Sequence, residues 1–91
     1  MTKVCKTLVI KNKLGLHARP ATKLAQLSAQ YDAELHLQIG SKSANACSVL
    51  GLMMLEGQQG KSIDVTATGP DAEEALDAVE ALICHNFYEE D

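Results

Sequence analysis

Two segments of the 91-residue chain alternate between apolar and polar side chains, which is the pattern of a half-buried β-strand. In residues 33–39 and 61–68 every second side chain is apolar. Residues 3–10 are rich in β-branched and aliphatic residues, and this composition also favours a strand. A turn at 40–42 and a weaker extended segment at 43–46 follow the first alternating segment. The pattern therefore predicts four strands.

Three further segments have the spacing or the composition of helices. Residues 18–30 place apolar side chains three and four positions apart, and Pro20 suits a first turn, where its missing N–H costs nothing. Residues 48–55 are apolar almost all round, and Ser48 is a candidate N-cap. A last helix opens at 69–71 and carries a one-sided apolar stripe. The sequence therefore predicts two amphipathic helices and one short apolar helix.

The predicted elements follow one another in the order β-α-β-β-α-β-α. Each strand buries one face and each long helix buries one stripe, so the economical arrangement is an α+β fold with two layers. We expect an open-faced sandwich, in which a four-stranded antiparallel sheet carries the three helices on one side. No repeat or linker divides the chain, which predicts a single domain over residues 1–91. The acidic tail at 86–91 is expected to be frayed.

Charge is distributed unevenly along the chain, whose formal net charge is −4. All eight Lys and Arg residues lie in residues 1–61, whereas residues 62–91 carry nine acids and no Lys or Arg. An acidic segment of this kind repels nucleic acids and anionic membrane surfaces. The chain also lacks the stacking side chains of a nucleic-acid interface, since its only aromatic residues are Tyr31, Phe87 and Tyr88. We therefore expect no nucleic-acid partner.

No apolar run approaches the roughly 20 residues of a membrane-spanning helix, and the N-terminal residues lack the pattern of a secretory signal. Cys5, Cys47 and Cys84 are too few and too scattered for a disulfide framework, and no CxxC pair suggests a metal site. These features predict a cytoplasmic protein with reduced thiols, no membrane insertion, no metal and no cofactor.

The residues that carry candidate chemistry are concentrated in residues 15–21 (GLHARPA). His17 precedes the predicted helix, and the only arginine of the chain, Arg19, lies two residues later. Unpaired N–H groups at a helix start attract anions, and a guanidinium offers paired donors to phosphate oxygens. The same field disfavours the imidazolium form, so His17 is expected to be neutral and nucleophilic near pH 7. Gly15 lets the backbone turn close to the incoming group.

This constellation suits reversible acceptance of a phosphoryl group on a ring nitrogen. The residues alone leave a plainer interpretation open, in which His17 is a loop residue before a helix and Arg19 is a solvated charge. Residues 15–21, however, resemble the active-centre signature of the HPr phosphocarrier family of the bacterial phosphoenolpyruvate-dependent phosphotransferase system. Residues 43–52 resemble the second signature of that family, and the segment 60–68 follows in register, so the resemblance covers nearly the whole chain.

The resemblance implies an HPr-like fold and a phosphoryl relay rather than an enzyme with turnover. His17 would accept a phosphoryl group from phosphorylated enzyme I on Nδ1 and pass it to a IIA protein, with Arg19 steadying the group. Gly15, Ala18 and Pro20 would form the phosphoryl-binding loop and helix start. The resemblance also implies a surface that docks partner proteins, formed by Leu16, Thr22, Val49, Leu50 and Met53. Ser48 matches a regulatory phosphorylation site of some members, although the N-cap interpretation is preferred for it.

Two features favour the nitrogen-related branch of the family over its sugar-transport branch. Residues 68–75 and the acidic end at 87–91 resemble the nitrogen-related members. Lysines that surround the docking helices in sugar-branch carriers are replaced here by Gln26, Ala29, Cys47 and Gly51. We therefore expect a monomer that serves the enzyme I and the IIA protein of the nitrogen branch. A sugar-branch carrier for carbohydrate uptake is the alternative, and a small non-enzymatic regulatory or sensor domain is a more distant one.

Overall fold

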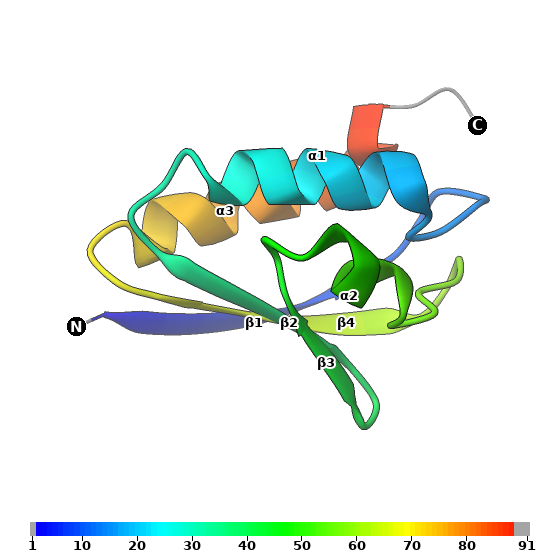
Figure 1. Cartoon of the computed structure of the whole chain (residues 1–91), viewed down its shortest axis with the longest axis horizontal. Coiled ribbons are helices and arrows are strands. Elements are labelled where there is room, and N and C mark those ends of the chain that lie inside the picture. Colours follow the sequence, from blue (N-terminus) through cyan, green and yellow to red (C-terminus); the bar gives the residue numbers. More distant parts are fainter. Residues whose placement is uncertain (1, 89–91) are drawn as a thin grey trace.

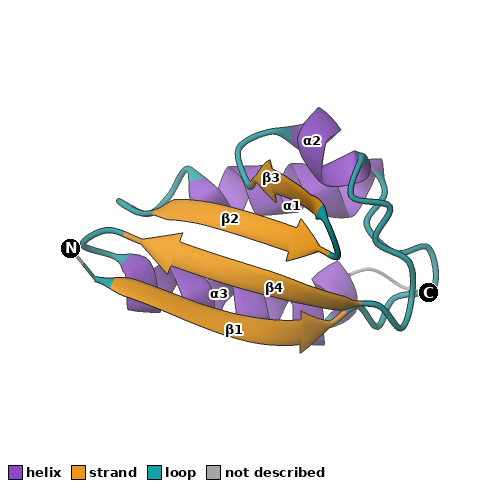
Figure 2. Ribbon diagram, turned by 90° about the horizontal axis from the view of Figure 1, so that it is seen from below, coloured by secondary structure: helices purple, strands orange, loops and turns teal. Residues whose placement is uncertain are grey.

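The computed structural model describes residues 2–88 and shows two layers (Figures 1 and 2). Four antiparallel strands form one sheet in the spatial order β1-β4-β2-β3. The helices cover one face of that sheet, and the other face is open. The elements are β1 (Lys3–Val9), α1 (Ala18–Ser28), β2 (Glu34–Ile39), β3 (Lys42–Asn45), α2 (Val49–Met53), β4 (Ser62–Thr68), α3 (Ala72–Cys84) and a short 3₁₀ turn, η1 (Asn86–Tyr88). The predicted fold class is confirmed.

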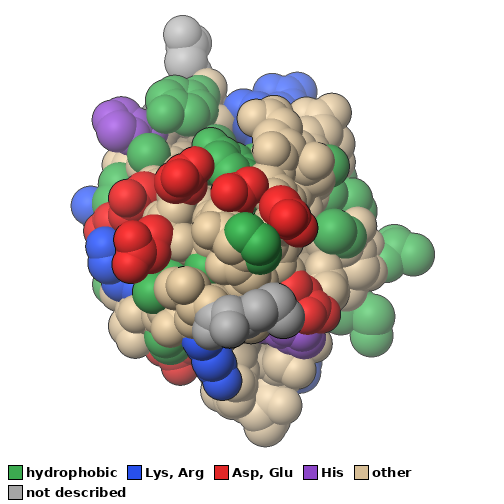
Figure 3. Space-filling view, turned by 90° about the vertical axis from the view of Figure 1, so that its left-hand side faces the viewer, with side chains coloured by type: hydrophobic (Ala, Val, Ile, Leu, Met, Phe, Trp, Pro, Cys, Tyr) green, Lys and Arg blue, Asp and Glu red, His purple; other side chains and the backbone are tan. Residues whose placement is uncertain are grey.

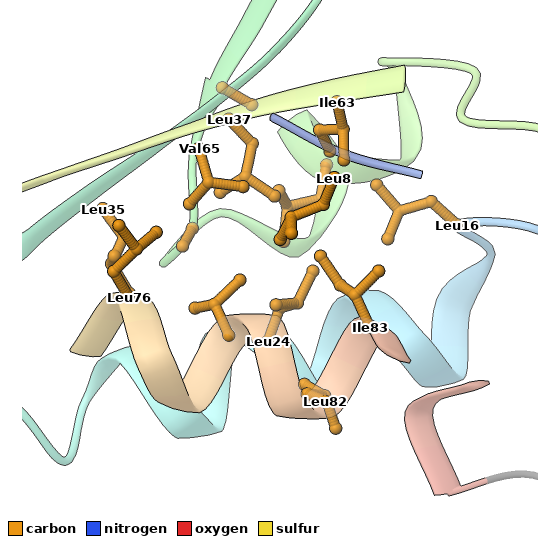
Figure 4. Packing of buried hydrophobic residues seen from close by; sticks show 14 of the residues in the cluster. Leu8, Leu16, Leu24, Leu35, Leu37, Ile63, Val65, Leu76, Leu82 and Ile83 are labelled. Atoms are coloured by element: carbon orange, nitrogen blue, oxygen red, sulfur yellow. The ribbon is translucent and has the colours of Figure 1, made fainter. Parts of the chain in front are cut away.

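The register of the strands explains why alternation in the sequence predicted the sheet. Leu37 lies opposite Val65 and Leu8 lies opposite Ile63, so the apolar positions of neighbouring strands fall on the same face. That face packs against α1 and α3, whose buried residues include Leu24. Figure 4 shows these side chains meeting between the sheet and the helices. The core therefore lies between the sheet and the helices and consists mostly of aliphatic side chains.

The short helix α2 begins as the sequence predicted. Ser48 is its N-cap, and the Ser48 Oγ accepts a hydrogen bond from the backbone N–H of Gly51 at 3.0 Å. Such a bond satisfies one of the N–H groups that a helix start leaves without an intrahelical acceptor. Leu52 and Leu55 turn inward and are buried. The cap therefore sets where this nearly all-apolar segment begins to coil.

The expectation of a frayed tail is wrong for residues 86–88, and residues 89–91 lie outside the part of the chain described. Phe87 is fully buried in the core. Asn86, Phe87 and Tyr88 all have positive φ angles, which turn the chain back onto the helices. The ammonium group of Lys23, on α1, donates a hydrogen bond to the Phe87 carbonyl. A single returning aromatic residue has no periodicity, so the sequence pattern did not reveal this anchor.

Acidic side chains gather at the end of the molecule where α3 begins (Figure 3). Glu73 and Glu74 occupy the first turn of α3, where the helix dipole favours negative charge. The start of α1 lies at the opposite end of the molecule (Figure 1).

Within residues 2–88, no helix is both long enough and apolar enough to cross a membrane.

Candidate active site

The loop between β1 and α1 is held by backbone hydrogen bonds on both sides of Gly15. The Gly15 N–H donates to the Asn12 carbonyl at 3.2 Å, and the His17 N–H donates to the Gly15 carbonyl at 3.1 Å. The Leu16 N–H reaches across to the Gly57 carbonyl at 2.7 Å. These bonds tie the loop to the segment that follows α2 and fix the chain at the point where α1 begins.

Gly15 is required by a close approach of two backbone segments. Its φ is +66°, a conformation that side-chain-bearing residues rarely adopt. A Cβ atom added there would lie 2.1 Å from the Gly57 carbonyl oxygen. The sequence predicted that Gly15 brings the backbone close to an incoming group. The structure shows that Gly15 also lies close to Gly57, whose part in the loop was missed because only the fold brings the two glycines together.

His17 is the N-cap residue of α1 and has extended backbone angles (φ −94°, ψ −167°). Its side chain is half-buried, and its Nε2 atom is shielded from solvent. The first hydrogen bond of the helix is donated by the Ala21 N–H to the His17 carbonyl at 3.0 Å. The N–H of Ala18 lies before that bond, in the turn where helix geometry supplies no acceptor. The imidazole therefore stands at the electropositive end of α1.

Arg19 and Ala18 are exposed in the first turn of α1, whereas Pro20 is buried beside them. The predicted first-turn position of Pro20 is confirmed. Thr22 is exposed one turn further along, and its hydroxyl donates to the Ala18 carbonyl at 2.8 Å. The structure thus places Arg19 in the first turn of the helix that His17 caps.

An apolar surface lies on α2 and at its end. Leu50 is 76% exposed, Met53 is 39% exposed and Met54 is 72% exposed; we call these three residues the α2 patch. The helix that carries them packs against α1. Leu14, in the loop before His17, is also exposed. Met54 and Leu14 were not among the predicted docking residues, because the sequence pattern did not show which apolar side chains point outward.

Two of the predicted docking residues lie elsewhere than expected. Leu16 is 5% exposed and belongs to the core, where its side chain points toward those of the sheet (Figure 4). A buried side chain offers a partner almost no surface, so the Leu16 side chain does not fit its expected place in the docking surface. Val49 is half-buried and packs against the core, so it offers only part of its surface. Leu50 and Met53, in contrast, are both exposed.

Comparison with known proteins identifies the family. Residues 4–84 match the family model described as "PTS HPr component phosphorylation site". The chain is 53% identical to the phosphocarrier protein NPr of Shewanella violacea, over 98% of each chain, and 49% identical to that of Escherichia coli K12, over 96% of this chain and 98% of the relative. An HPr structure from Thermoanaerobacter tengcongensis superposes with a TM-score of 0.88 at 40% identity, covering 99% of both chains. The chain therefore belongs to the HPr family of phosphocarrier proteins, and its similarity to the NPr proteins supports the nitrogen-related branch of the phosphotransferase system.

Proposed function

We propose that His17 is the residue that carries the phosphoryl group. The observation that supports this most directly is the position of His17 as the N-cap of α1, with Arg19 in the first turn. Because Nε2 is shielded from solvent, a donor would reach the ring at Nδ1. The Nδ1 lone pair attacks phosphorus, the new N–P bond forms, and the bond from phosphorus to enzyme I breaks. In the second transfer an acceptor group of the IIA protein attacks phosphorus, a new bond to that group forms, and the N–P bond to His17 breaks.

Arg19 and the start of α1 supply the positive field that steadies the phosphoryl oxygens. A relay must not hold its cargo too tightly, since each ~1.4 kcal/mol of extra stabilisation slows onward transfer up to about tenfold. One guanidinium and a few backbone N–H groups suit that requirement. Gly15, Ala18 and Pro20 set the backbone that presents these groups.

The test is intact-mass measurement after incubation with phosphoenolpyruvate, Mg²⁺ and enzyme I of either branch. We expect the wild-type protein to gain one acid-labile phosphoryl group and His17→Ala to gain none. His36→Ala is the matched control, because His36 is an exposed histidine on the sheet, and it should label like wild type. Stoichiometric labelling of His17→Ala would exclude His17 as the acceptor.

Arg19→Ala is expected to slow both transfer steps, and unchanged rates in both would remove Arg19 from the proposed mechanism. Faster labelling by the nitrogen-branch enzyme I would support the proposed partner pair of nitrogen-branch enzyme I and IIA protein. A preference for the sugar-branch enzyme would favour the carbohydrate-uptake alternative. Absence of labelling by both would favour a regulatory or sensor domain.

The α2 patch is the proposed docking surface for both partners, together with Thr22 on the neighbouring helix. Flexible methionine side chains suit one surface that must meet two different proteins. For Ser48 we propose a capping role in preference to a regulatory phosphorylation site, because its hydroxyl accepts the Gly51 N–H.

We further propose that the protein acts in the cytoplasm and as a monomer. An HPr from Thermoanaerobacter tengcongensis with 39% identity to this chain has been solved as a dimer, so the oligomeric state requires its own measurement. Analytical ultracentrifugation before and after phosphorylation would provide it. A stable dimer at micromolar concentration would contradict the monomer.

A further inference from the structure

Asn12 is buried in the loop that carries His17, where its side chain is 1% exposed. The Asn12 Nδ2 donates a hydrogen bond to the Gly15 carbonyl at 2.8 Å. The other end of the carboxamide, Oδ1, is also buried and accepts no hydrogen bond from the part of the chain described. Burying a polar atom without a partner costs stability, so native proteins rarely do it without another reason. An apolar residue at this position would avoid the cost.

The Gly15 carbonyl links Asn12 to the candidate phosphoryl acceptor. This oxygen accepts both the Asn12 side-chain amide at 2.8 Å and the His17 backbone N–H at 3.1 Å. The Gly15 N–H in turn donates to the Asn12 carbonyl at 3.2 Å, which closes residues 12–15 into a turn. The side chain of Asn12 therefore holds the Gly15 carbonyl, and the backbone N–H of His17 donates to the same carbonyl.

We propose that Asn12 is a positioning residue for phosphoryl transfer at His17. Its amide holds the Gly15 carbonyl toward the His17 N–H, and this fixes the backbone of His17 at the start of α1. The ring is then held with Nε2 inward and Nδ1 toward the donor. Loss of the amide frees the carbonyl to rotate, and the imidazole then samples orientations that present the wrong nitrogen. The inference rests on the proposed role of His17.

The physical reason to expect a kinetic effect is preorganisation. A misplacement of about 1 Å at a reacting group can cost on the order of 100-fold in rate. The hydrogen bonds that join Asn12 to Gly15 lie within the loop and not on the α2 patch. Its loss should therefore slow the transfer step itself and leave the affinity for enzyme I unchanged.

Two variants and one matched control test this role. Asn12→Asp keeps the shape and loses the donor, and Asn12→Ala removes the whole group. The control is Ser28→Ala, which removes another side-chain hydrogen bond of a buried residue, from the Ser28 Oγ to the Ala25 carbonyl at 2.8 Å, at the far end of α1. We expect both Asn12 variants to lower the kcat of phosphorylation by enzyme I at least about tenfold at unchanged KM. Ser28→Ala should leave both constants as in wild type.

Nitrogen-15 NMR of the His17 ring in the unphosphorylated protein gives a readout that stability alone would not move. We expect the ring signals to shift in both Asn12 variants and to stay unchanged in Ser28→Ala. Variants that are less stable but keep the wild-type ring signals and kcat would show a purely structural role and overturn the proposal. Because this readout needs no phosphoryl transfer, it separates failure of the positioning role from failure of His17 as acceptor.

A measurement on wild type covers the case in which both Asn12 variants fail to fold. The side-chain amide signals of Asn12 should shift as the His17 ring is titrated with acid, because the Gly15 carbonyl that accepts the Asn12 amide also accepts the backbone N–H of His17. Amide signals that stay constant through the titration of the ring would overturn the proposal.

Discussion

The loop that carries His17 is tied by a hydrogen bond, from the Leu16 N–H to the Gly57 carbonyl, to the segment that follows the short helix α2. The loop and α2 are built in different ways. The loop is fixed by backbone atoms and by one buried carboxamide, and at Gly15 it has no room for a side chain. The outer face of α2 consists of exposed side chains, of which Leu50 is the most exposed. The candidate phosphoryl site is thus positioned by main-chain geometry, whereas the proposed docking surface consists of exchangeable side chains.

This difference suggests how one family can use the same chemistry with separate sets of partners. A change in the loop disturbs the acceptor itself, whereas a change on the face of α2 alters which protein is recognised. Partner choice is a difference between affinities, and exposed side chains can change it without moving the backbone. Substitutions in the two regions should therefore differ in kind as well as in size.

Gly15→Ala should have the largest effect. The added Cβ would meet the Gly57 carbonyl oxygen at 2.1 Å, and φ would remain at +66° unless the loop moved. We expect the unfolding free energy to fall by about 3 kcal/mol, from strain and overpacking together. The displaced loop should also slow labelling by enzyme I about 100-fold. Urea denaturation and intact-mass kinetics measure the two effects.

Gly40→Ala is the matched control for the loop. Gly40 also has a positive φ, +60°, but no atom lies within 4 Å of the position of an added Cβ. This variant should lose only about 1 kcal/mol, from the backbone conformation alone, and should label at the wild-type rate. Equal losses in the two variants would show that contact with Gly57 does not matter, and the contrast between loop and helix would then fail.

Leu50→Ser tests the other side of the comparison. Leu50 is 76% exposed, so the unfolding free energy should change by less than about 0.5 kcal/mol. If Leu50 is covered by a partner, losing that burial should raise the KM for enzyme I about tenfold, since 1.4 kcal/mol is a factor of ten in affinity. Steady-state labelling kinetics at varied carrier concentration would measure this change.

Leu52→Ala separates docking from folding within the same helix. Leu52 is fully buried, so this variant should lose about 3 kcal/mol of stability and keep the wild-type KM at temperatures where it remains folded.

A wild-type KM in Leu50→Ser would show that α2 does not contact enzyme I. The docking surface would then have to lie elsewhere.

Ser48→Ala should have a smaller effect, confined to α2. It removes the hydrogen bond from the Gly51 N–H to the Ser48 Oγ, 3.0 Å long, and the loss of an N-cap costs about 1 kcal/mol. Amide hydrogen exchange should become faster in α2 and stay unchanged in α1. Ser48→Asp restores a capping acceptor and should recover most of the loss. Unchanged exchange in Ser48→Ala would show that the cap does not hold the helix.

The elements with clear periodicity could be predicted from sequence, and the contacts between distant segments could not. Alternation located β2 and β4 within one or two residues, because each buries one face against the helices. Ser48 was identified as a cap because capping depends on local sequence alone. The fold class followed from these elements, since few arrangements bury all of their apolar faces.

The site was predicted where its residues are neighbours in sequence and missed where they are not. His17 and Arg19 could be placed together because both belong to the start of one helix. Leu16 could not be assigned to the core, since a single apolar residue in a loop has no period that shows its direction. Gly57 and Phe87 were missed as anchors for the same reason. Their partners are known only once the chain is folded.

The smallest predicted effect concerns the ion pair that joins the segment after α2 to β3. The Lys42 Nζ lies 2.8 Å from the Glu56 Oε1, next to Gly57. The hydrogen bond from Lys42 and its positive charge hold the pKa of Glu56 below its ordinary value of 4.5. A lowered pKa stabilises the fold above pH 4.5, and this contribution is lost as the pH falls through the folded value. Because both groups are exposed, the contribution is small and sensitive to salt.

Lys42→Met should therefore be slightly less stable than wild type at pH 7, and the difference should shrink as the pH falls below 4.5 and through the folded pKa of Glu56. Urea denaturation from pH 7 downwards measures it, and Lys11→Met is the control, because Lys11 is exposed and forms no ion pair within residues 2–88. An identical pH profile for the two variants would show that the Glu56 pair contributes nothing specific. If Lys42→Met also slows labelling by enzyme I, the segment around Gly57 transmits changes in α2 to the His17 loop. Unchanged labelling would mean that the two regions meet at Gly57 without coupling.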